Sequence, residues 1–219
     1  MDARSFKDTI YNEFARIGKV LSSPKRLELL DLLSQSPKSV EGLSKETKMS
    51  MANTSKHLQA LLDARLVSYK KEKNYVIYQL ANPEVTDLLF SLKSIAEAQM
   101  ADVNLLRESF IKRGEDLETL ELEDWVERKK EESHILIDVR PKAEYLSGHL
   151  DGAISIPMEE LNDYIRNLPK DKKVIAYCRG PYCVYATEAV EYLKAEGFDA
   201  ARLEAGIHEW NQYKEQHTH

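Results

Sequence analysis

The stretch Val174-Ile175-Ala176-Tyr177-Cys178-Arg179-Gly180-Pro181-Tyr182-Cys183 contains both cysteines of this 219-residue chain. Its apolar beginning is typical of a buried strand, and the residues after Cys183 have the apolar spacing of a helix. A cysteine at such a strand-to-helix turn lies close to the N-terminus of the helix, where backbone N–H groups and the helix dipole stabilise its thiolate. Two thiols at one turn therefore indicate sulfur chemistry rather than core packing.

Strand and helix patterns alternate on both sides of this turn, which predicts an α/β domain with a mainly parallel sheet. Such sheets bind their ligands at the carboxyl ends of the strands, and Cys178 directly follows a strand. We expect strands over 135–140, 153–156, 174–177 and 200–203, and helices over 120–130, 159–167, 184–196 and 206–214.

Several motifs, ordered along residues 118–215, resemble the rhodanese family. They are Asp138-Val139-Arg140, Glu144-Tyr145, Gly148-His149-Leu150-Asp151-Gly152-Ala153, Ile156-Pro157, Tyr177-Cys178-Arg179-Gly180 and Leu203-Glu204-Ala205-Gly206-Ile207-His208-Glu209-Trp210. The resemblance implies a rhodanese-like domain in which Cys178 is the nucleophile and carries a sulfane sulfur as a persulfide. It places Arg179 and Gly180 in the active loop, where Arg179 either adds positive charge or is solvated and Gly180 allows a tight turn. We expect Asp138 and Arg140 to form a structural ion pair at the strand end.

The loop departs from the sulfurtransferase pattern at its last residue. Sulfurtransferase loops of this length often end in Arg or Lys, which helps to hold an anionic donor such as thiosulfate, whereas this loop ends in Cys183. The Cys183 thiolate can attack a persulfide on Cys178 to give a disulfide and sulfide, or sulfur atoms can stay bridged between the two cysteines. A plain disulfide requires Cα atoms about 4.4–6.8 Å apart. Trivalent arsenic or antimony held by the two thiolates is a further alternative.

The N-terminal half has the pattern of helices followed by a β-hairpin. We expect helices over 6–21, 24–36, 39–45 and 50–62, a hairpin of 67–71 and 75–80 around Lys73-Asn74, and a long helix from Pro83 to about Arg113. The apolar positions of this long helix and of the first helix predict a dimer interface.

Three segments of this half resemble the ArsR family of bacterial repressors: Val40-Glu41-Gly42-Leu43-Ser44, the run from Met49 to Leu61, and Ala64-Arg65-Leu66-Val67. The resemblance implies a mainly α winged helix-turn-helix domain that binds double-stranded operator DNA as a homodimer. Four residues match positions facing the major groove and two match wing positions, namely Asn53, Ser55, Lys56 and His57, then Lys71 and Lys73. Metal-sensing members typically carry a cysteine pair at the start of the third helix. Here that region reads Ser39-Val40-Glu41-Gly42-Leu43, so sensing has to reside elsewhere.

The charge distribution agrees with a DNA-binding first half. Residues 1–113 carry 18 Lys and Arg against 14 Asp and Glu, whereas residues 114–219 carry 13 against 23. A basic region on a protein of net charge −6 indicates a localised phosphate-binding face. The composition changes at residues 112–116. We therefore expect a DNA-binding and dimerisation domain over 1–113, a linker over 114–119 and the rhodanese-like domain over 120–219.

Composition also limits where the protein acts. Apolar residues make up 42% and charged residues 31% of the chain, and no apolar run approaches the ~20 residues of a membrane span. The N-terminus carries acidic residues and lacks the apolar segment of a signal peptide. We expect a cytoplasmic protein with no membrane partner, no cofactor and no metal ligands.

These patterns together predict a homodimeric transcriptional repressor that responds to a small sulfur donor, a persulfide or polysulfide, through Cys178 and Cys183. Two alternatives stay open. One is a sulfurtransferase enzyme that carries a DNA-binding domain. The other is a repressor that responds to arsenic, antimony or thiol oxidation through the same cysteines.

Overall fold

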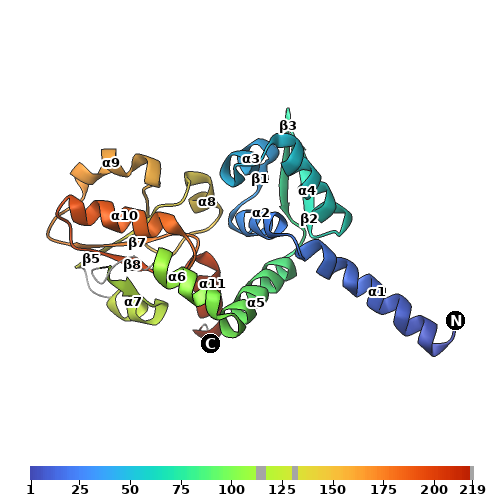
Figure 1. Cartoon of the computed structure of the whole chain (residues 1–219). Coiled ribbons are helices and arrows are strands. Elements are labelled where there is room, and N and C mark those ends of the chain that lie inside the picture. The colour runs from blue at the N-terminus through green and yellow to red at the C-terminus, as the bar shows by residue number, and fades with distance from the viewer. Residues whose placement is uncertain (112–116, 130–132, 218–219) are drawn as a thin grey trace. The chain divides into compact units, whose positions relative to one another are not determined.

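A computed structural model describes residues 1–111, 117–129 and 133–217 of the chain (Figure 1). The chain forms two compact units, Met1–Ala96 and Glu97–His219. No helix among these described residues is long and apolar enough to cross a membrane.

The first unit is a helix-turn-helix followed by an antiparallel hairpin. Its elements are α1 (Ala3–Leu21), α2 (Pro24–Gln35), β1 (Lys38–Ser39), α3 (Val40–Thr47), α4 (Met51–Asp63), β2 (Val67–Glu72), β3 (Tyr75–Leu80) and the start of α5 (Pro83–Gln99). The hydroxyl oxygens of Ser39 and Ser50 cap α3 and α4 by accepting backbone N–H groups of Gly42 at 3.0 Å and Asn53 at 3.3 Å. Each serine thereby satisfies a donor that the first helical turn leaves unpaired.

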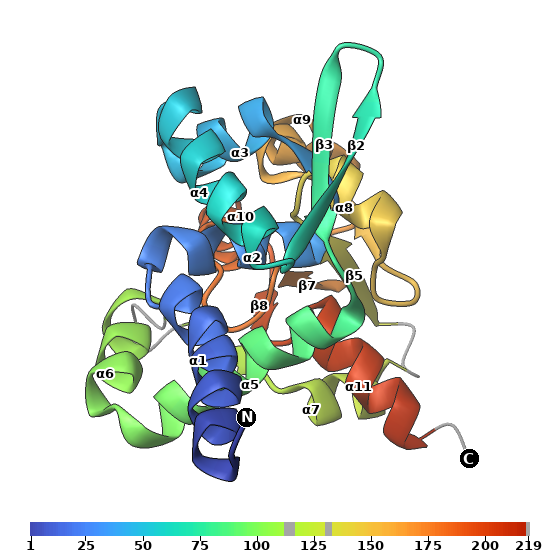
Figure 2. The ribbon, with the colours of Figure 1, turned by 90° about the vertical axis from the view of Figure 1, so that its right-hand side faces the viewer.

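The hairpin forms the wing of this unit and projects from the helices (Figure 2). Its register pairs Val67 with Leu80 and Glu72 with Tyr75, and the turn residue Lys73 has φ 54°. Five leucines with no exposed surface form the centre of the core beneath the wing, Leu29, Leu30, Leu43, Leu58 and Leu61. The predicted winged helix-turn-helix fold is confirmed.

The second unit is an α/β domain. Its elements after α5 are α6 (Ala101–Phe110), β4 (Thr119–Leu120), α7 (Leu122–Arg128), β5 (His134–Asp138), α8 (Lys142–Ser147), β6 (Ile154–Ser155), η1 (Met158–Glu160), α9 (Leu161–Tyr164), η2 (Ile165–Asn167), β7 (Lys173–Tyr177), α10 (Val184–Ala195), β8 (Ala200–Leu203) and α11 (Ile207–His217). The five strands are ordered β4-β8-β7-β5-β6 and pair in parallel, as predicted.

Strand β7 lies in the middle of this sheet, and its side chains alternate between two cores. Val174 and Ala176 pack in the cluster that includes α9 and α10, whereas Ile175 and Tyr177 pack in the cluster that includes α7 and α11. Figure 1 shows these helices covering the two faces of the sheet. Because successive strand residues point to opposite faces, Cys178 falls on the α10 side at the carboxyl end of the strand.

The long helix expected from Pro83 to Arg113 is two helices in the structure. Met100 interrupts it with φ −115° and ψ 102°, and the Asn104 side-chain amide donates to the Glu97 carbonyl at 2.9 Å. That side chain satisfies a carbonyl that the interruption leaves without a helical partner. At the C-terminal end of α6, Ile111 is buried and its carbonyl oxygen accepts a hydrogen bond from the Thr187 hydroxyl at 3.1 Å. Helix α6 therefore packs within the second unit. Residues 112–116, which include the start of the expected linker, lie outside the described residues.

Candidate functional site

The two cysteines lie at the two ends of the loop that joins β7 to α10, and their sulfur atoms are bonded. Their Cα atoms are 6.0 Å apart, which falls inside the range for a disulfide. Cys178 is 1% exposed, whereas Cys183 is half-buried and is the N-cap residue of α10. The structure therefore places both thiols between a strand end and a helix start, as the sequence predicts.

Two glycines allow the loop to take its path. Gly180 has φ +114°, a conformation that side chains disfavour, and its carbonyl accepts the Cys183 N–H at 3.1 Å. Gly206, in the turn between β8 and α11, lies directly against the loop. A Cβ atom at residue 206 would be 2.8 Å from the carbonyl carbon of Arg179 and 2.9 Å from the backbone nitrogen of Gly180. The loop and this turn therefore fit together only because residue 206 lacks a side chain.

A buried arginine that sequence reasoning missed holds the loop backbone. Arg202 of β8 has no exposed surface, and its Nη2 donates to the carbonyl oxygens of Pro181 at 2.9 Å and Gly180 at 3.3 Å. Its Nη1 lies 3.4 Å from Glu204, whose carboxylate also pairs with Arg107 of α6. Burial lowers the pKa of the Arg202 guanidinium, and the carboxylate of Glu204 opposes that shift. A charged residue within the apolar strand 200–203 is the sequence signal that could have identified it.

Arg179 is held by an acidic partner that sequence reasoning did not assign. Its guanidinium makes two hydrogen bonds to Glu144 of α8, with Nε–Oε2 at 2.9 Å and Nη2–Oε1 at 2.5 Å. Glu144 has no exposed surface. The positive charge of Arg179 is thus balanced by a buried carboxylate in this structure, and the side chain is positioned rather than solvated.

Tyr182 connects the loop to α5 through its hydroxyl group, which donates to the carboxylate of Glu97. Burial and the hydrogen bond to Glu97 raise the pKa of the Tyr182 phenol. The hydroxyl therefore stays protonated at neutral pH and acts as the donor.

The strand end before the loop is fixed by the buried ion pair that the sequence predicts. Arg140 Nη2 lies 2.6 Å from Asp138 Oδ2, and neither side chain is exposed. The Tyr177 hydroxyl donates to the same carboxylate at 2.5 Å and accepts the Leu150 N–H at 3.1 Å. These bonds connect β5 and β7 just below Cys178, so they fix the strand end from which the loop begins.

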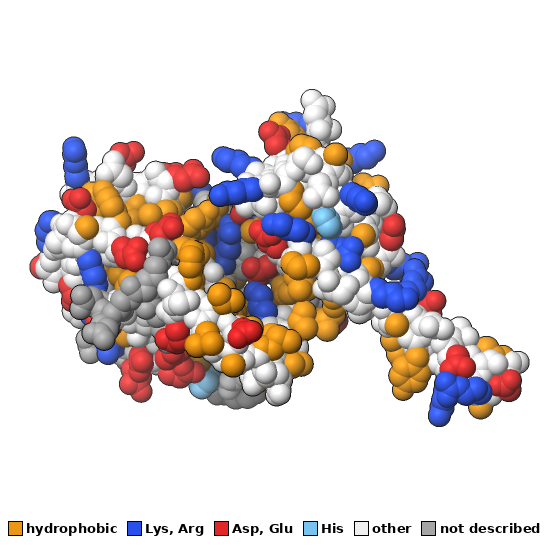
Figure 3. Space-filling model, in the orientation of Figure 1, with side chains coloured by type: hydrophobic (Ala, Val, Ile, Leu, Met, Phe, Trp, Pro, Cys, Tyr) orange, Lys and Arg blue, Asp and Glu red, His pale blue; other side chains and the backbone are white. Residues whose placement is uncertain are grey.

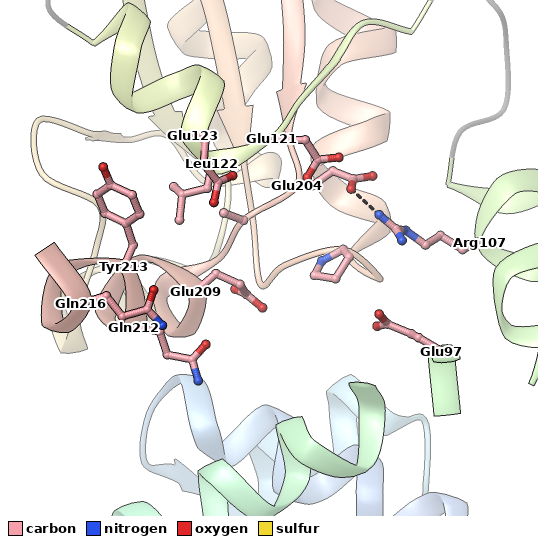
Figure 4. A pocket seen from close by; sticks show the side chains of 12 residues that line it. Glu97, Arg107, Glu121, Leu122, Glu123, Glu204, Glu209, Gln212, Tyr213 and Gln216 are labelled. Carbon is pink, nitrogen blue, oxygen red and sulfur yellow. Dashed lines mark hydrogen bonds and ion pairs between the residues drawn. The ribbon is translucent and has the colours of Figure 1, made fainter. Parts of the chain in front are cut away.

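A pocket of about 470 Å³ opens beside the loop, and Pro181 is part of its lining. Five glutamates and one arginine line it: Glu97, Glu121, Glu123, Glu204, Glu209 and Arg107. Figure 4 shows the Arg107 guanidinium directed at Glu204, with Glu97 at the end of α5 on the same side. Acidic side chains therefore outnumber basic ones in the lining of this pocket.

The candidate DNA-contacting residues lie on α4 and on the wing. Asn53, Ser55 and Lys56 are exposed on α4, and His57 is half-buried on the same helix. The wing residues Lys71 and Lys73 are also exposed. Figure 3 shows basic side chains spread over the α3–α4 region of the first unit and apolar side chains along α1 and α5.

The electrostatics of α4 bear on His57 in particular. Burial lowers the pKa of its imidazole, and the positive charges of Arg26 and Lys56 lower it further. The side chain is therefore neutral in the unbound protein at neutral pH. Among the described residues, no group of three or more His, Cys, Asp and Glu side chains is arranged to hold a metal ion.

Each half of the chain matches a known protein family. The family model of the bacterial regulatory protein, arsR family, matches residues 23–69, and that of the rhodanese-like domain matches residues 121–213. The chain is 36% identical over 204 residues to the HTH-type transcriptional regulator Rv0324 of Mycobacterium tuberculosis, covering 93% of this chain and 89% of that protein.

Two other relatives match over shorter lengths. The arsenical resistance operon repressor of Staphylococcus xylosus is 40% identical over 79 residues, covering 36% of this chain and 75% of that protein. The probable adenylyltransferase/sulfurtransferase MoeZ of Mycobacterium tuberculosis is 35% identical over 101 residues, covering 45% of this chain and 25% of that protein.

The fold and the two-cysteine loop define the class, a winged helix-turn-helix regulator joined to a rhodanese-like domain. The chain belongs to the ArsR family of bacterial transcriptional regulators and carries a rhodanese-like domain after its DNA-binding unit.

Proposed function

We propose that this regulator is a homodimeric repressor that senses reactive sulfur at Cys178 and Cys183. The observation that carries the proposal is the position of these residues, which are the two cysteines of the chain and are bonded across the rhodanese loop. The helix-turn-helix unit contains no cysteine in its sequence. Any thiol-based signal to that unit therefore starts at the loop.

The chemistry follows from thiol–disulfide exchange. The Cys178 thiolate attacks the outer sulfur of a donor persulfide RS–SH, which transfers this sulfur to Cys178 and releases RS⁻. The Cys183 thiolate then attacks the Cys178 sulfur of the new persulfide, forming the Cys178–Cys183 disulfide and expelling HS⁻. The two cysteines lose two electrons, and the transferred sulfur is reduced to sulfide. A bridge that retains one or more sulfur atoms is the alternative product.

The DNA-binding part of the proposal rests on exposure and charge. Asn53, Ser55 and Lys56 lie on the exposed side of α4. Their short or flexible polar side chains would contact base edges and phosphates. Lys71 and Lys73 on the wing would contact the DNA backbone. His57 would lie at the border of the contact because it is half-buried.

The dimer rests on apolar surface in the first unit. Helix α1 contains no buried residue, and its Phe6 and Phe14 are 53% and 62% exposed. Leu92 and Ile95 of α5 are exposed at 38% and 61%. Large apolar side chains at helical spacing on two helices of one unit favour a helix-mediated homodimer, because burial of such surface drives association.

Catalytic turnover of thiosulfate is not favoured at this site. Cys183 occupies the loop position where sulfurtransferase loops of this length often carry a basic residue that holds the anionic donor. The two thiolates could also bind trivalent arsenic or close on peroxide treatment. The Staphylococcus xylosus relative is named an arsenical resistance operon repressor, so a response to trivalent arsenic has to be tested beside the response to sulfur.

Cysteine variants test the proposal. DNA binding by the wild type, Cys178→Ser and Cys183→Ser is compared with and without sodium tetrasulfide, at one salt concentration because phosphate contacts make affinity salt-dependent. We expect the donor to weaken DNA binding by the wild type and to leave both variants bound to DNA. A response in both variants equal to that of the wild type would contradict the proposal. Arsenite and hydrogen peroxide are used in parallel. A response to arsenite alone would indicate a metalloid sensor, and a response to peroxide alone would indicate a sensor of thiol oxidation.

A further inference from the structure

The side chain of Tyr182 connects the cysteine loop to helix α5. Tyr182 directly precedes Cys183, and its hydroxyl donates to the carboxylate of Glu97, which lies in the last turn of α5. Both side chains are half-buried, so water competes less for this bond than on an open surface.

A second connection runs from the loop backbone to α6. Arg202 donates to the Pro181 carbonyl at 2.9 Å and lies 3.4 Å from Glu204, and Glu204 pairs with Arg107 of α6. Arg202, Glu204 and Arg107 are 1%, 6% and 19% exposed in their side chains. Breaking such a shielded set leaves a buried charge without its partner, which is costly. The loop conformation and the position of α6 are therefore mutually dependent.

The chemistry of the cysteines changes the spacing within this loop. The bonded pair holds the two Cα atoms 6.0 Å apart. Opening the bond removes this constraint, and inserting one sulfur lengthens the bridge by one S–S bond of about 2 Å. Tyr182 is one residue from Cys183, so we expect a change in the bridge to displace its hydroxyl relative to Glu97.

Helix α5 belongs at its other end to the core of the helix-turn-helix unit. Val85 and Leu89 of α5 are buried in that core, 6% and 3% exposed. The continuous helix thus carries Glu97 at one end and core residues of the DNA-binding unit near the other. Helix α5 is thus a single segment that contacts the cysteine loop through Glu97 and the core of the DNA-binding unit through Val85 and Leu89.

We infer that the Tyr182–Glu97 hydrogen bond is the contact through which the state of the cysteine loop acts on DNA binding. This inference rests on the proposed function and identifies its regulatory link. Tyr182 and Glu97 are positioning residues, since they act through α5 and not on the sulfur donor. By reciprocity, bound DNA changes the equilibrium of bridge formation by the same factor by which the bridge changes DNA affinity.

The test compares the ratio of DNA dissociation constants with the cysteines bonded and reduced. The variants are Glu97→Ala, which removes the acceptor, Glu97→Gln, which keeps an acceptor oxygen, and Tyr182→Phe, which removes the donor. Tyr185→Phe is the matched control, because Tyr185 is exposed on α10. Intact mass spectrometry measures the fraction of bonded cysteines in every sample.

In the wild type we expect a ratio within the range of about 5–150 that is typical of allosteric coupling. Glu97→Ala and Tyr182→Phe should each reduce this ratio to between about 1 and 2, while their cysteines still form the bond. The double variant should show no further loss, because each single change already removes the same Tyr182–Glu97 hydrogen bond. Glu97→Gln and Tyr185→Phe should keep most of the ratio. A residue needed only for folding would lower both affinities and leave their ratio intact.

Full wild-type ratios in Glu97→Ala and Tyr182→Phe, with bonded cysteines, would overturn the inference and leave the proposed function standing. A wild-type ratio of one would instead contradict the proposed function, and with it the inference.

Discussion

The carboxylate of Asp138 accepts a hydrogen bond from the guanidinium of Arg140 at 2.6 Å, and both side chains are buried directly below the cysteine loop. The Tyr177 hydroxyl donates to the same carboxylate. Removing one partner of a buried ion pair typically costs about 3–5 kcal/mol, because the remaining charge stays buried without compensation. The stability of the rhodanese-like unit therefore depends on this cluster.

Asp138→Ala should lower the free energy of unfolding of this unit by about 3–5 kcal/mol. Urea titration followed by tryptophan fluorescence measures it selectively, because the two tryptophans of the chain, Trp125 and Trp210, both lie in the second unit. Asp151→Ala is the control, since Asp151 is exposed and a surface change should stay within about 0.5 kcal/mol. Equal stability of the two variants would contradict the structural role of Asp138.

Gly206→Ala should distort the cysteine loop. The added Cβ would lie 2.8 Å from the Arg179 carbonyl carbon, and overpacking of this kind costs about 1–3 kcal/mol. We expect lower stability and a several-fold slower bonding of the two cysteines when reduced protein is treated with diamide. Gly148→Ala is the matched control, because Gly148 has an extended φ of 167° and its Cβ would meet Ile207 at an ordinary 3.5 Å. Unchanged bonding kinetics in Gly206→Ala would show that the loop tolerates the displacement.

Lys71→Ala should weaken DNA binding to all operator variants alike, because a contact to phosphate carries no sequence information. Loss of one phosphate contact should reduce the slope of log Kd against log salt by about 0.9. Fluorescence anisotropy across a salt series gives this slope. Lys142→Ala provides the control, since Lys142 is exposed on the rhodanese-like unit. An unchanged slope for Lys71→Ala would show that Lys71 makes no contact with a DNA phosphate.

His57 makes DNA binding pH-dependent if it faces a phosphate. Its pKa is lowered in the unbound protein by burial and by neighbouring positive charges. A nearby phosphate raises that pKa, so the complex binds the proton more tightly than the unbound protein does. Affinity should then rise as the pH falls from 7.5 to 6, by at most about tenfold per pH unit for one proton.

His57→Gln should abolish this rise in affinity on acidification. The measurement is anisotropy at constant ionic strength over the same pH interval. A wild-type profile as flat as that of His57→Gln would place the imidazole away from the phosphates.

Local sequence signals were sufficient to predict most of the fold. The apolar run before Cys178 and the serines at residues 39 and 50 determine strand β7 and the starts of α3 and α4, because each acts on its immediate neighbours. The pairing of Asp138 with Arg140 was also predictable, since the two residues are close in the chain and end one strand.

Contacts between distant residues were not predictable from the sequence. Glutamates such as Glu97 and Glu144 are usually exposed, and only tertiary packing brings them to the cysteine loop. Arg202 stands out as a charged residue in an apolar strand, but its contact with the loop also depends on tertiary packing. The interruption at Met100 has no proline or glycine to mark it. At this interruption the side chain of Asn104 takes over a backbone hydrogen bond.

Sulfur-responsive DNA binding is tested most directly by fluorescence anisotropy with DNA from immediately upstream of the gene. Fully reduced protein is compared with the same protein after polysulfide treatment, at one fixed salt concentration. We predict that treatment weakens binding and that a thiol reductant restores it, with the Cys178–Cys183 bond lost in parallel. Tight binding that polysulfide leaves unchanged, while mass spectrometry shows the two cysteines modified, would contradict this prediction.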